Sequence, residues 1–303
     1  MPDGTVEIVD PNQSVEVFER PHLEHGNILG YGSCSQGVLG NGSLLKQTNP
    51  CAIKPSFFSG QSVVKLSTFH THCIALTSAG HVYTWGNGST NALGHPKRGL
   101  KDLYRPTRVE FEHNEDLTFL DVAAGYDFSL FLDNDGKVWS CGKGSYGQLG
   151  NAKATVAAPA KAWEEFPELM QKDVVRLSAG YQHALAFTVD KKLLGWGQNS
   201  YGQLGFGKPT TSEKKPKEVK RPNTVITQID SGYDHLLMLS TKGQVLSFGK
   251  NKSGALGNGS PTNPSNTPQI VGGVLNEVKA IWVAAGDTHS VVLGDDSSVY
   301  SWG

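Results

Sequence analysis

The sequence is short of net charge, of long hydrophobic runs and of cysteine, and each shortage excludes a class of protein. Charged residues make up 18% of the 303 positions, and 27 Lys and Arg balance 28 Asp and Glu. A near-neutral chain lacks the basic excess of proteins that bind nucleic acid or anionic membranes. Its 38% of hydrophobic and 9% of aromatic residues argue against disorder. We therefore expect a globular protein, and nucleic acid is not an expected partner.

Membrane insertion, secretion and zinc binding are not indicated either. No apolar run approaches the roughly 20 residues that a transmembrane helix requires. The stretch 1–20 contains five acidic side chains and one arginine, which fits neither a secretory signal nor a mitochondrial presequence. The four cysteines, Cys34, Cys51, Cys73 and Cys141, are widely separated and form no CxxC pair. These absences favour an intracellular protein, cytoplasmic or nuclear, with reduced thiols.

Glycine, by contrast, is abundant, and much of it belongs to a repeat. It supplies 36 of the 303 residues, against a usual share of roughly 7%. A dipeptide that usually pairs an aromatic residue with glycine recurs six times at nearly equal intervals. Its period of roughly fifty residues is typical of stacked or radial repeat proteins. The dipeptides are Tyr31-Gly32, Trp85-Gly86, Cys141-Gly142, Trp196-Gly197, Phe248-Gly249 and Trp302-Gly303.

Two further landmarks keep a fixed distance from this dipeptide. A Leu-Gly pair follows it in five repeats, and the two glycines are eight residues apart every time. A landmark glycine stands at one constant distance before the closing glycine, at Gly125, Gly180, Gly232 and Gly286, and Phe69 holds that place in the first repeat. Length varies only in the remaining stretch. We expect the constant parts to be strands and turns, and the variable part to be a surface loop.

Each repeat contains about four short apolar stretches separated by polar turns. Residues 184–197, ALAFTVDKKLLGWG, show two such stretches around a turn. Asn134-Asp135-Gly136 is a hairpin signal in the preceding repeat. A four-stranded sheet of this size cannot bury both faces alone, whereas sheets stacked radially cover one another. The sequence predicts an all-β protein: a β-propeller of four-stranded antiparallel blades, with five complete repeat units and an extra N-terminal strand at 28–32.

The repeat resembles that of the regulator of chromosome condensation family. The matching pieces are SAGYQHALAF and LLGWGQNSYGQLG at 178–205, SGYDHLLML and VLSFGKNKSGALG at 231–257, and AAGDTHSVVL with VYSWG at the end. The resemblance covers residues 28–303, which we assign to the propeller, and leaves 1–27 as an acidic N-terminal segment. It implies a ring that usually has seven blades. We expect either a fragment of a longer protein or an unusually small ring.

The two residues after each landmark glycine are candidates for binding a partner. If the repeats superpose, these pairs form a ring in rim loops on one face of the disc. Tyrosine beside aspartate offers rigid aromatic area, a hydroxyl and a carboxylate for a basic partner, while the alternative is that they are ordinary exposed turn residues. The candidates are His70, Tyr126, Asp127, Tyr181, Gln182, Tyr233, Asp234 and Asp287.

A basic, proline-punctuated stretch at 208–222 is a second candidate. We interpret it as a solvated loop between strands, with a nuclear import signal or a patch for an acidic partner or nucleic acid as alternatives. The basic residues of this loop include Lys214, Lys215, Lys217, Lys220 and Arg221.

The histidines do not indicate catalysis. One histidine position recurs as His72, His183, His235 and His289, and Phe128 replaces it in one repeat. A position that recurs blade after blade and tolerates phenylalanine is typical of a structural hydrogen-bonding residue. No nucleophile elbow, Walker loop or zinc motif is present. We therefore predict no catalytic residue, no metal and no cofactor, and classify the chain as a non-enzyme.

The resemblance implies two kinds of function. The founding member of the family exchanges guanine nucleotide on a Ran-like small GTPase, using a β-wedge inserted between a dipeptide and the following Leu-Gly pair. Here that spacing is eight residues in all five repeats, so this insertion is missing. We expect a non-enzymatic interaction module that binds and regulates a Ras-like or Ran-like small GTPase, similar to an exchange factor. The alternative is a scaffold or adaptor for other protein partners without exchange activity.

Overall fold

The short apolar stretches form β-strands along the whole described chain. The computed structural model describes residues 28–95, 100–111, 117–150, 156–162, 174–220, 224–260 and 263–303. Helix within these ranges is limited to short 3-10 turns such as η2 (Pro55–Phe58), and none of them is long enough to cross a membrane. The predicted acidic segment 1–27 lies outside the described residues.

The strands pair antiparallel with their neighbours in sequence and form six sheets within the described ranges. Four sheets have four strands each, one has three and one has two. The two-stranded sheet is β1 (Leu29–Gly32) and β2 (Gln47–Ala52). The four-stranded sheets are β3 (Val63–Phe69), β4 (His72–Thr77), β5 (Val82–Gly86) and β6 (Leu103–Arg108); β7 (Phe119–Gly125), β8 (Phe128–Asp133), β9 (Val138–Lys143) and β10 (Val156–Ala162); β11 (Val174–Ala179), β12 (His183–Thr188), β13 (Leu193–Gln198) and β14 (Ser212–Glu218); and β15 (Ile226–Ser231), β16 (His235–Ser240), β17 (Val245–Gly249) and β18 (Ser265–Ile270). The three-stranded sheet is β19 (Ala280–Ala285), β20 (Ser290–Gly294) and β21 (Val299–Trp302).

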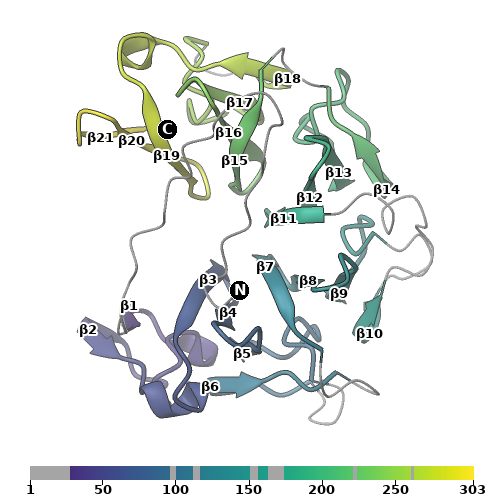
Figure 1. Ribbon diagram of the computed structural model, residues 1–303, viewed down its shortest axis with the longest axis vertical. Coiled ribbons are helices and arrows are strands. Elements are labelled where there is room, and N and C mark those ends of the chain that lie inside the picture. The colour runs from purple at the N-terminus through teal and green to yellow at the C-terminus, as the bar shows by residue number, and fades with distance from the viewer. Residues whose placement is uncertain are drawn as a thin grey trace.

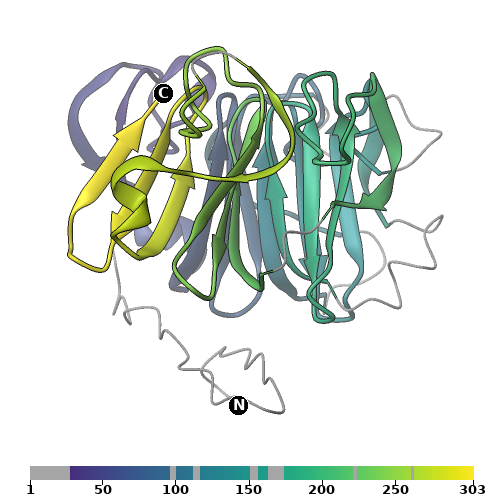
Figure 2. The ribbon, with the colours of Figure 1, turned by 90° about the horizontal axis from the view of Figure 1, so that it is seen from above.

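The sheets are arranged around a common axis, as in a propeller. Figure 1 looks along this axis, and β3, β7, β11, β15 and β19 are the strands nearest to it. In Figure 2 the same sheets are seen from the side, with their strands running between the two faces of a short disc. The predicted fold class, an all-β propeller of antiparallel blades, is confirmed.

The repeat in the sequence is offset by one strand from the sheets in space. The stretch between successive dipeptide glycines always contains four strands: the outermost strand of one sheet and the three inner strands of the next. From Gly142 to Gly197, for example, β10 joins the sheet of β7 to β9, while β11, β12 and β13 begin a new sheet. The five predicted repeat units and the extra strand β1 are all present. Each repeat therefore ties two neighbouring blades together covalently.

The hydrophobic core lies between neighbouring sheets. Along β12, Ala184 and Ala186 pack toward the sheet of β7 to β10, whereas Leu185 and Phe187 pack toward the sheet of β15 to β18. This alternation follows from the two-residue period of a strand. Each interior sheet thus buries both faces against its neighbours, as the sequence predicts.

The constant eight-residue spacing has a structural reason in contacts between blades. The indole Nε1 of Trp196 donates a hydrogen bond to the carbonyl oxygen of Gln148, 2.8 Å away, in the turn that ends at Leu149-Gly150 of the preceding repeat. Trp85 and Trp302 make the same bond to Val38 and Ala255. A change in turn length would move this carbonyl away from the indole, which would leave a buried N–H group unpaired.

Two of the repeating glycines are required by close approach. At Gly197 the φ angle is +98°, and a Cβ atom would lie 2.4 Å from the carbonyl oxygen of Gln182. At Gly180 a Cβ atom would lie 2.2 Å from Cε1 of His183, because the imidazole ring packs directly over the glycine. The landmark glycine and the repeating histidine are therefore one packing unit.

Candidate partner-binding face

The turns that follow the innermost strands bring the candidate residues together near the axis. They lie beside the axis and not at the rim, where we predicted them, because the strands that lead into them are the innermost strands of their blades. Main-chain hydrogen bonds link these turns from blade to blade: the N–H of Tyr181 donates to the carbonyl of Tyr233 at 3.1 Å, and the N–H of Tyr233 donates to that of Asp287 at 3.2 Å. The turns form one continuous surface at this end of the axis.

Four aromatic side chains from four successive blades form a continuous row on this surface. The rings of Tyr181 and Tyr233 are stacked, with centroids 3.9 Å apart and an angle of 13° between planes. Tyr126 lies 4.6 Å from Tyr181, and His70 packs edge-on against Tyr126 at 5.5 Å. The three tyrosines are half-buried and His70 is exposed. We name His70, Tyr126, Tyr181 and Tyr233 the axial tyrosine row.

The second residue of each pair is buried beneath the row. Asp127, Gln182 and Asp234 are only 7%, 7% and 4% exposed, so they do not present a surface to a partner. Asp287, which follows the landmark glycine of the last repeat, is exposed. The predicted ring of tyrosines and acids is therefore a layer of rings above a layer of buried polar groups.

Asp234 lies among three side chains that the sequence analysis did not single out. Lys250 Nζ lies 3.0 Å from Oδ2 of Asp234, and Gln203 Nε2 donates to Oδ1 at 3.2 Å. The same ammonium lies 4.4 Å from the ring of Tyr201 and 5.9 Å from the ring of Tyr233, within the range of cation–π attraction. Lys250 follows the dipeptide glycine directly, and Tyr201 and Gln203 stand four and six residues after theirs. Their fixed positions after the dipeptide glycine are the sequence signal that could have identified these three residues.

Burial under the row perturbs the acid–base behaviour of these groups. Desolvation raises the pKa of Asp234, and the hydrogen bond and charge of Lys250 oppose this rise. Desolvation likewise raises the pKa of Asp127, against the charge of Lys143 and a hydrogen bond from Thr71. Burial and a hydrogen bond with Tyr181 hold the pKa of Tyr233 above its ordinary value. Tyr233 therefore stays protonated near neutral pH and acts as a neutral hydrogen-bonding group.

One blade earlier, the same arrangement is built from three glutamines. Gln182 takes the repeat position of Asp234, Gln198 that of Lys250 and Gln148 that of Gln203. The main chain is unchanged, because Gln198 donates its N–H to the carbonyl of Gln182 at 2.7 Å, as Lys250 does to Asp234 at 2.9 Å. Within the described residues, Nε2 of Gln148 and Oε1 of Gln198 are buried without a hydrogen-bond partner. This junction is therefore less well satisfied than the next.

The repeating histidines have a packing role, and two of them bridge blades. Nε2 of His72 lies 2.7 Å from Oγ of Ser129, and His235 lies 3.1 Å from Ser290 in the same way. His183 is fully buried, and neither ring nitrogen has a hydrogen-bond partner among the described residues. Burial lowers its pKa to about 3 and so keeps the ring neutral. Within those residues, no three His, Cys, Asp or Glu side chains are grouped as metal ligands.

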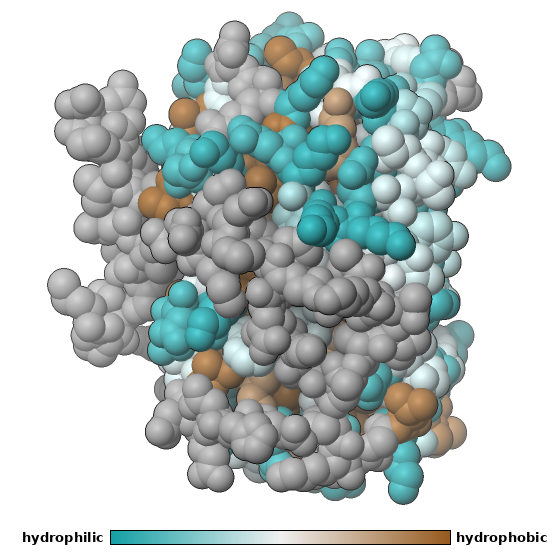
Figure 3. Space-filling view, turned by 90° about the vertical axis from the view of Figure 1, so that its right-hand side faces the viewer, coloured by the Kyte–Doolittle hydropathy of each residue, from teal (hydrophilic) through white to brown (hydrophobic). Residues whose placement is uncertain are grey.

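The basic stretch is an edge strand and not the loop we predicted. Lys214, Lys215 and Lys217 lie on β14, which pairs with β13 at the outer edge of its sheet and exposes these lysines to solvent. Lys220 follows the strand and is exposed, and Arg221 lies outside the described residues. Figure 3 shows the side of the molecule that carries β14, where hydrophilic residues cover much of the visible described surface.

The reason for a strand here is the geometry of the blade, which places the fourth strand of each sheet at its outer edge. Every such strand contains one proline: Pro106, Pro159, Pro216 and Pro268. An edge strand tolerates proline, because an N–H group is not needed there, and proline together with lysine discourages pairing with another chain. The lysines of β14 therefore protect an open edge in addition to any binding role.

Comparison with known proteins places this geometry in a family. The model of the RCC1-like domain matches residues 22–303. The yeast (Saccharomyces cerevisiae) guanine nucleotide exchange factor SRM1 is 32% identical over 82% of this chain and 54% of its own length. Human E3 ubiquitin-protein ligase HERC2 is 29% identical over 92% of this chain but 6% of its own length.

A solved structure supports the same assignment. The crystal structure of Prp20p from Saccharomyces cerevisiae, described with its binding to Gsp1p and histones, superposes with a TM-score of 0.79 at 29% identity. The match covers 92% of this chain and 68% of that chain. The chain thus spans about half the length of SRM1 and a small part of HERC2.

Proposed function

Because the chain belongs to the RCC1-like domain family, we propose that it is a non-enzymatic β-propeller that binds and regulates a Ras-like or Ran-like small GTPase. The observation that carries this proposal is the axial tyrosine row. Four blades contribute to it, so its geometry depends on the assembled propeller. A surface that exists only when these four blades are assembled is suited to recognising a folded partner.

The chemistry of the row fits a protein interface. Tyrosines supply large contact area with little loss of side-chain freedom, and their hydroxyls form directed hydrogen bonds. Backbone hydrogen bonds between the turns hold the rings in place before a partner arrives, which reduces the entropic cost of binding. Asp127 and Asp234 are buried, so the rings and not these carboxylates would contact a partner.

Two similarities support a GTPase as the partner. SRM1, which is similar over 82% of this chain, is a guanine nucleotide exchange factor. Prp20p, with a TM-score of 0.79, has been described with its binding to Gsp1p.

Binding without exchange is the second candidate function. Five dipeptides are followed by a Leu-Gly pair with the same eight-residue spacing, so none of these five turns is lengthened to act as a wedge. A propeller of this kind would serve as a scaffold or adaptor. We place either function inside the cell, in the cytoplasm or the nucleus, and imaging of a fluorescently tagged chain tests this placement.

The experiment measures GTPase binding and nucleotide release separately. Purified chain is titrated against Gsp1p and a panel of Ras-like GTPases by calorimetry, and release of fluorescent mant-GDP is followed in parallel. We expect Tyr126→Ala combined with Tyr233→Ala to weaken binding at least tenfold, which corresponds to about 1.4 kcal/mol. Tyr31→Ala is the control, because Tyr31 is 68% exposed and lies outside the row.

The outcomes separate the two functions. Binding with accelerated release would favour regulation by exchange, and binding without it would favour a GTPase-binding module that does not exchange nucleotide. No binding by any GTPase would contradict the proposed partner and favour the scaffold for other protein partners. A lower melting temperature of the double variant would show that the tyrosines stabilise the fold by packing and do not form a recognition surface.

A further inference from the structure

The axial tyrosine row ends beside a lysine that lies close to two aromatic rings. Lys250 directly follows Gly249, where β17 ends at the mouth of the axis that carries the row. Its ammonium lies 5.9 Å from the ring of Tyr233 in the row and 4.4 Å from the ring of Tyr201 in a turn of the preceding repeat. Tyr201 is 39% exposed and the side chain of Lys250 is 32% exposed, so both reach the surface. We name Tyr201, Tyr233 and Lys250 the aromatic lysine site.

The carboxylate beneath this site is fully engaged. Oδ2 of Asp234 lies 3.0 Å from Nζ of Lys250, and Oδ1 accepts a hydrogen bond from Nε2 of Gln203 at 3.2 Å. Oε1 of Gln203 accepts the main-chain N–H of Tyr201 at 2.9 Å, so one series of hydrogen bonds connects the turn of Tyr201 with the ammonium. In the part of the chain that the structure describes, Asp234 accepts the only hydrogen bond from Lys250. An ammonium has three N–H donors, which leaves two for an acceptor from outside.

The structure changes the sign of the charge that we expected this end of the row to offer. Asp127 and Asp234 are buried, so their carboxylates do not meet a basic partner as the sequence suggested. The accessible charge next to Tyr233 is the ammonium of Lys250. Asp287 in the next turn is exposed, but within the described residues Lys250 is ion-paired with Asp234 and not with Asp287. The aromatic lysine site therefore fits a negatively charged group.

The preceding blade has the same turn without the cation. Tyr146 takes the repeat position of Tyr201, and its main-chain N–H donates to Oε1 of Gln148 at 2.9 Å in the same way. Gln198 takes the position of Lys250. The turn and its tyrosine are thus built equally well with a neutral side chain at this position. Folding of the turn does not explain why Lys250 is a lysine.

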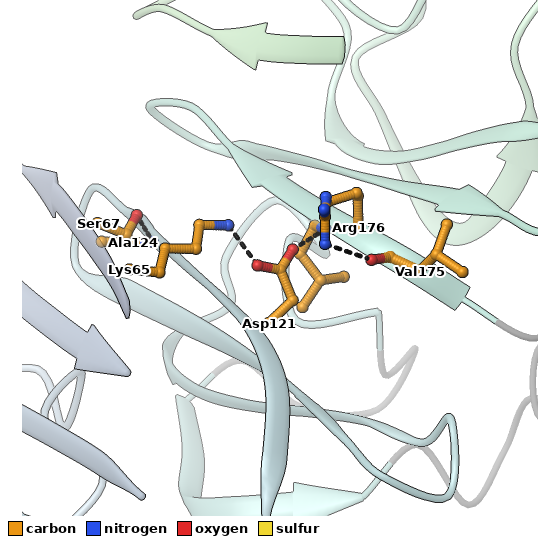
Figure 4. A network of polar contacts seen from close by, with 7 residues as sticks. Lys65, Ser67, Asp121, Ala124, Val175 and Arg176 are labelled. Carbon is orange, nitrogen blue, oxygen red and sulfur yellow. Dashed lines mark hydrogen bonds and ion pairs between the residues drawn. The ribbon is translucent and has the colours of Figure 1, made fainter. Parts of the chain in front are cut away.

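A second Lys–Asp pair between blades shows what such a pair does in the absence of rings. Figure 4 shows Lys65 of β3 with its Nζ 2.5 Å from Oδ1 of Asp121 on β7. The other oxygen of Asp121 accepts the N–H of Leu177 on β11 at 2.7 Å, so this carboxylate joins three successive blades. Among the described residues Lys65 has no cation–π contact, and it lies within a strand and not in a turn at the mouth. That pair serves assembly, whereas Lys250 is on the partner-binding face.

We propose that the aromatic lysine site binds a carboxylate of the partner, the side chain of an aspartate or glutamate. This inference rests on the proposed function, in which the axial tyrosine row binds a small GTPase. The carboxylate accepts charge-assisted hydrogen bonds from the ammonium of Lys250, and the methylene groups next to it pack on the rings of Tyr201 and Tyr233. The rings also shield this ion pair from water, which strengthens it. The GTPase surface that meets this end of the row is therefore acidic.

The first test removes the cation without leaving Asp234 unpaired. Asp234→Gln combined with Lys250→Gln copies the three-glutamine junction of the preceding blade, which this chain already builds. Calorimetry against Gsp1p, or any GTPase of the panel that binds, should show an affinity at least about fivefold lower and less sensitive to salt than that of wild type. Lys250→Arg keeps the charge and should retain most of the affinity. Lys242→Gln is the matched control, because Lys242 is exposed in the turn between β16 and β17, at the opposite end of the same blade.

A second test needs no GTPase. The lysines of the full chain are methylated with carbon-13, which keeps their charge, and NMR follows their signals during titration with a capped tripeptide of phenylalanine, glutamate and phenylalanine. The signal of Lys250, identified by its absence in the double variant, should shift and saturate, whereas the signal of Lys242 should not. The same tripeptide with glutamine in place of glutamate should shift neither signal.

The results distinguish this inference from the proposed function. GTPase binding that is equally strong in wild type and the double variant would overturn the carboxylate site and leave the proposed function standing. Equal responses of the two lysine signals to the tripeptide would overturn it as well. Absence of binding by every GTPase would contradict the proposed function, and the tripeptide titration would then decide on the carboxylate site alone.

Discussion

Replacing Gln182 with aspartate and Gln198 with lysine together should stabilise the protein. The two substitutions copy the junction one blade further on, where Asp234 accepts hydrogen bonds from Lys250 at 3.0 Å and Gln203 at 3.2 Å. The main-chain geometry of the two junctions already agrees. The new aspartate would accept a hydrogen bond from the buried Nε2 of Gln148, which has no hydrogen-bond partner among the described residues.

The magnitude follows from three contributions. Satisfying the buried amide contributes about 1 kcal/mol. The new ion pair contributes about 0.5 kcal/mol, because Lys250 in the junction that serves as template is 32% exposed and solvent screens the pair. Stacking of the ammonium on a tyrosine adds about 0.5 kcal/mol. We expect a gain of about 2 kcal/mol and a rise in Tm of about 4 °C.

A double-mutant cycle provides the assay. Thermal and urea unfolding are measured for wild type, both single variants and the double variant. Gln182→Asp alone buries a carboxylate without its cation and should lower the stability, while Gln198→Lys alone should change it little. The double variant should exceed the sum of the single effects by at least about 1 kcal/mol. Additive effects, or a double variant less stable than wild type, would refute the inferred equivalence of the two junctions.

Three further predictions concern buried groups and backbone strain. His183→Phe, which copies Phe128, should make stability depend less on pH on the acid side. In wild type the pKa of folded His183 is about 3, below the ordinary 6.5, so stability is lost as the pH falls from 6.5 to 3. Urea unfolding at several pH values measures this slope. Asp230→Asn should raise the free energy of unfolding above pH 6 and change it little below pH 3.8. The pKa of the folded carboxyl is raised to about 6, so its charged form, present above that pH, destabilises the fold. Calorimetry above pH 6 and below pH 3.8 tests this, and a loss of stability above pH 6 would contradict it. Gly197→Ala should lower the free energy of unfolding by about 3 kcal/mol, because φ is +98° and a Cβ atom would lie 2.4 Å from a main-chain oxygen. Gly136→Ala, where φ is +76° and no atom lies near the new Cβ, should lower it by about 1 kcal/mol in the same unfolding assay.

The fold could be predicted because the spacing of the repeats reports on contacts between blades. The constant distance from dipeptide to Leu-Gly pair reflects the bond from Trp196 to the carbonyl of Gln148, and the constant distance to the landmark glycine reflects the hairpin that follows it. Contacts of both kinds recur from blade to blade, so they leave a period in the sequence. The one-strand offset between sequence repeat and sheet could not be predicted, because a period in the sequence does not indicate at which strand each sheet begins.

The site was predicted only in part. The repeat positions of Tyr126, Tyr181 and Tyr233 were visible, and the structure brings the three rings into one row. Their placement near the axis and the burial of Asp127 and Asp234 were not visible, since both depend on how far each turn lies from the axis. Lys250 was missed although it holds a fixed place after the dipeptide glycine, because that place is a lysine in some repeats and a glutamine in another, and only the structure shows its side chain paired with Asp234.

Sequence alone determined the number of repeats, the strand content and the faces that neighbouring sheets bury, because these follow from alternation along each strand and from one period along the chain. Only the tertiary structure decided which side chains meet near the axis: the tyrosine rings of three successive blades. Those residues are about one repeat apart in sequence, and they come into contact only because successive sheets are rotated about a shared axis.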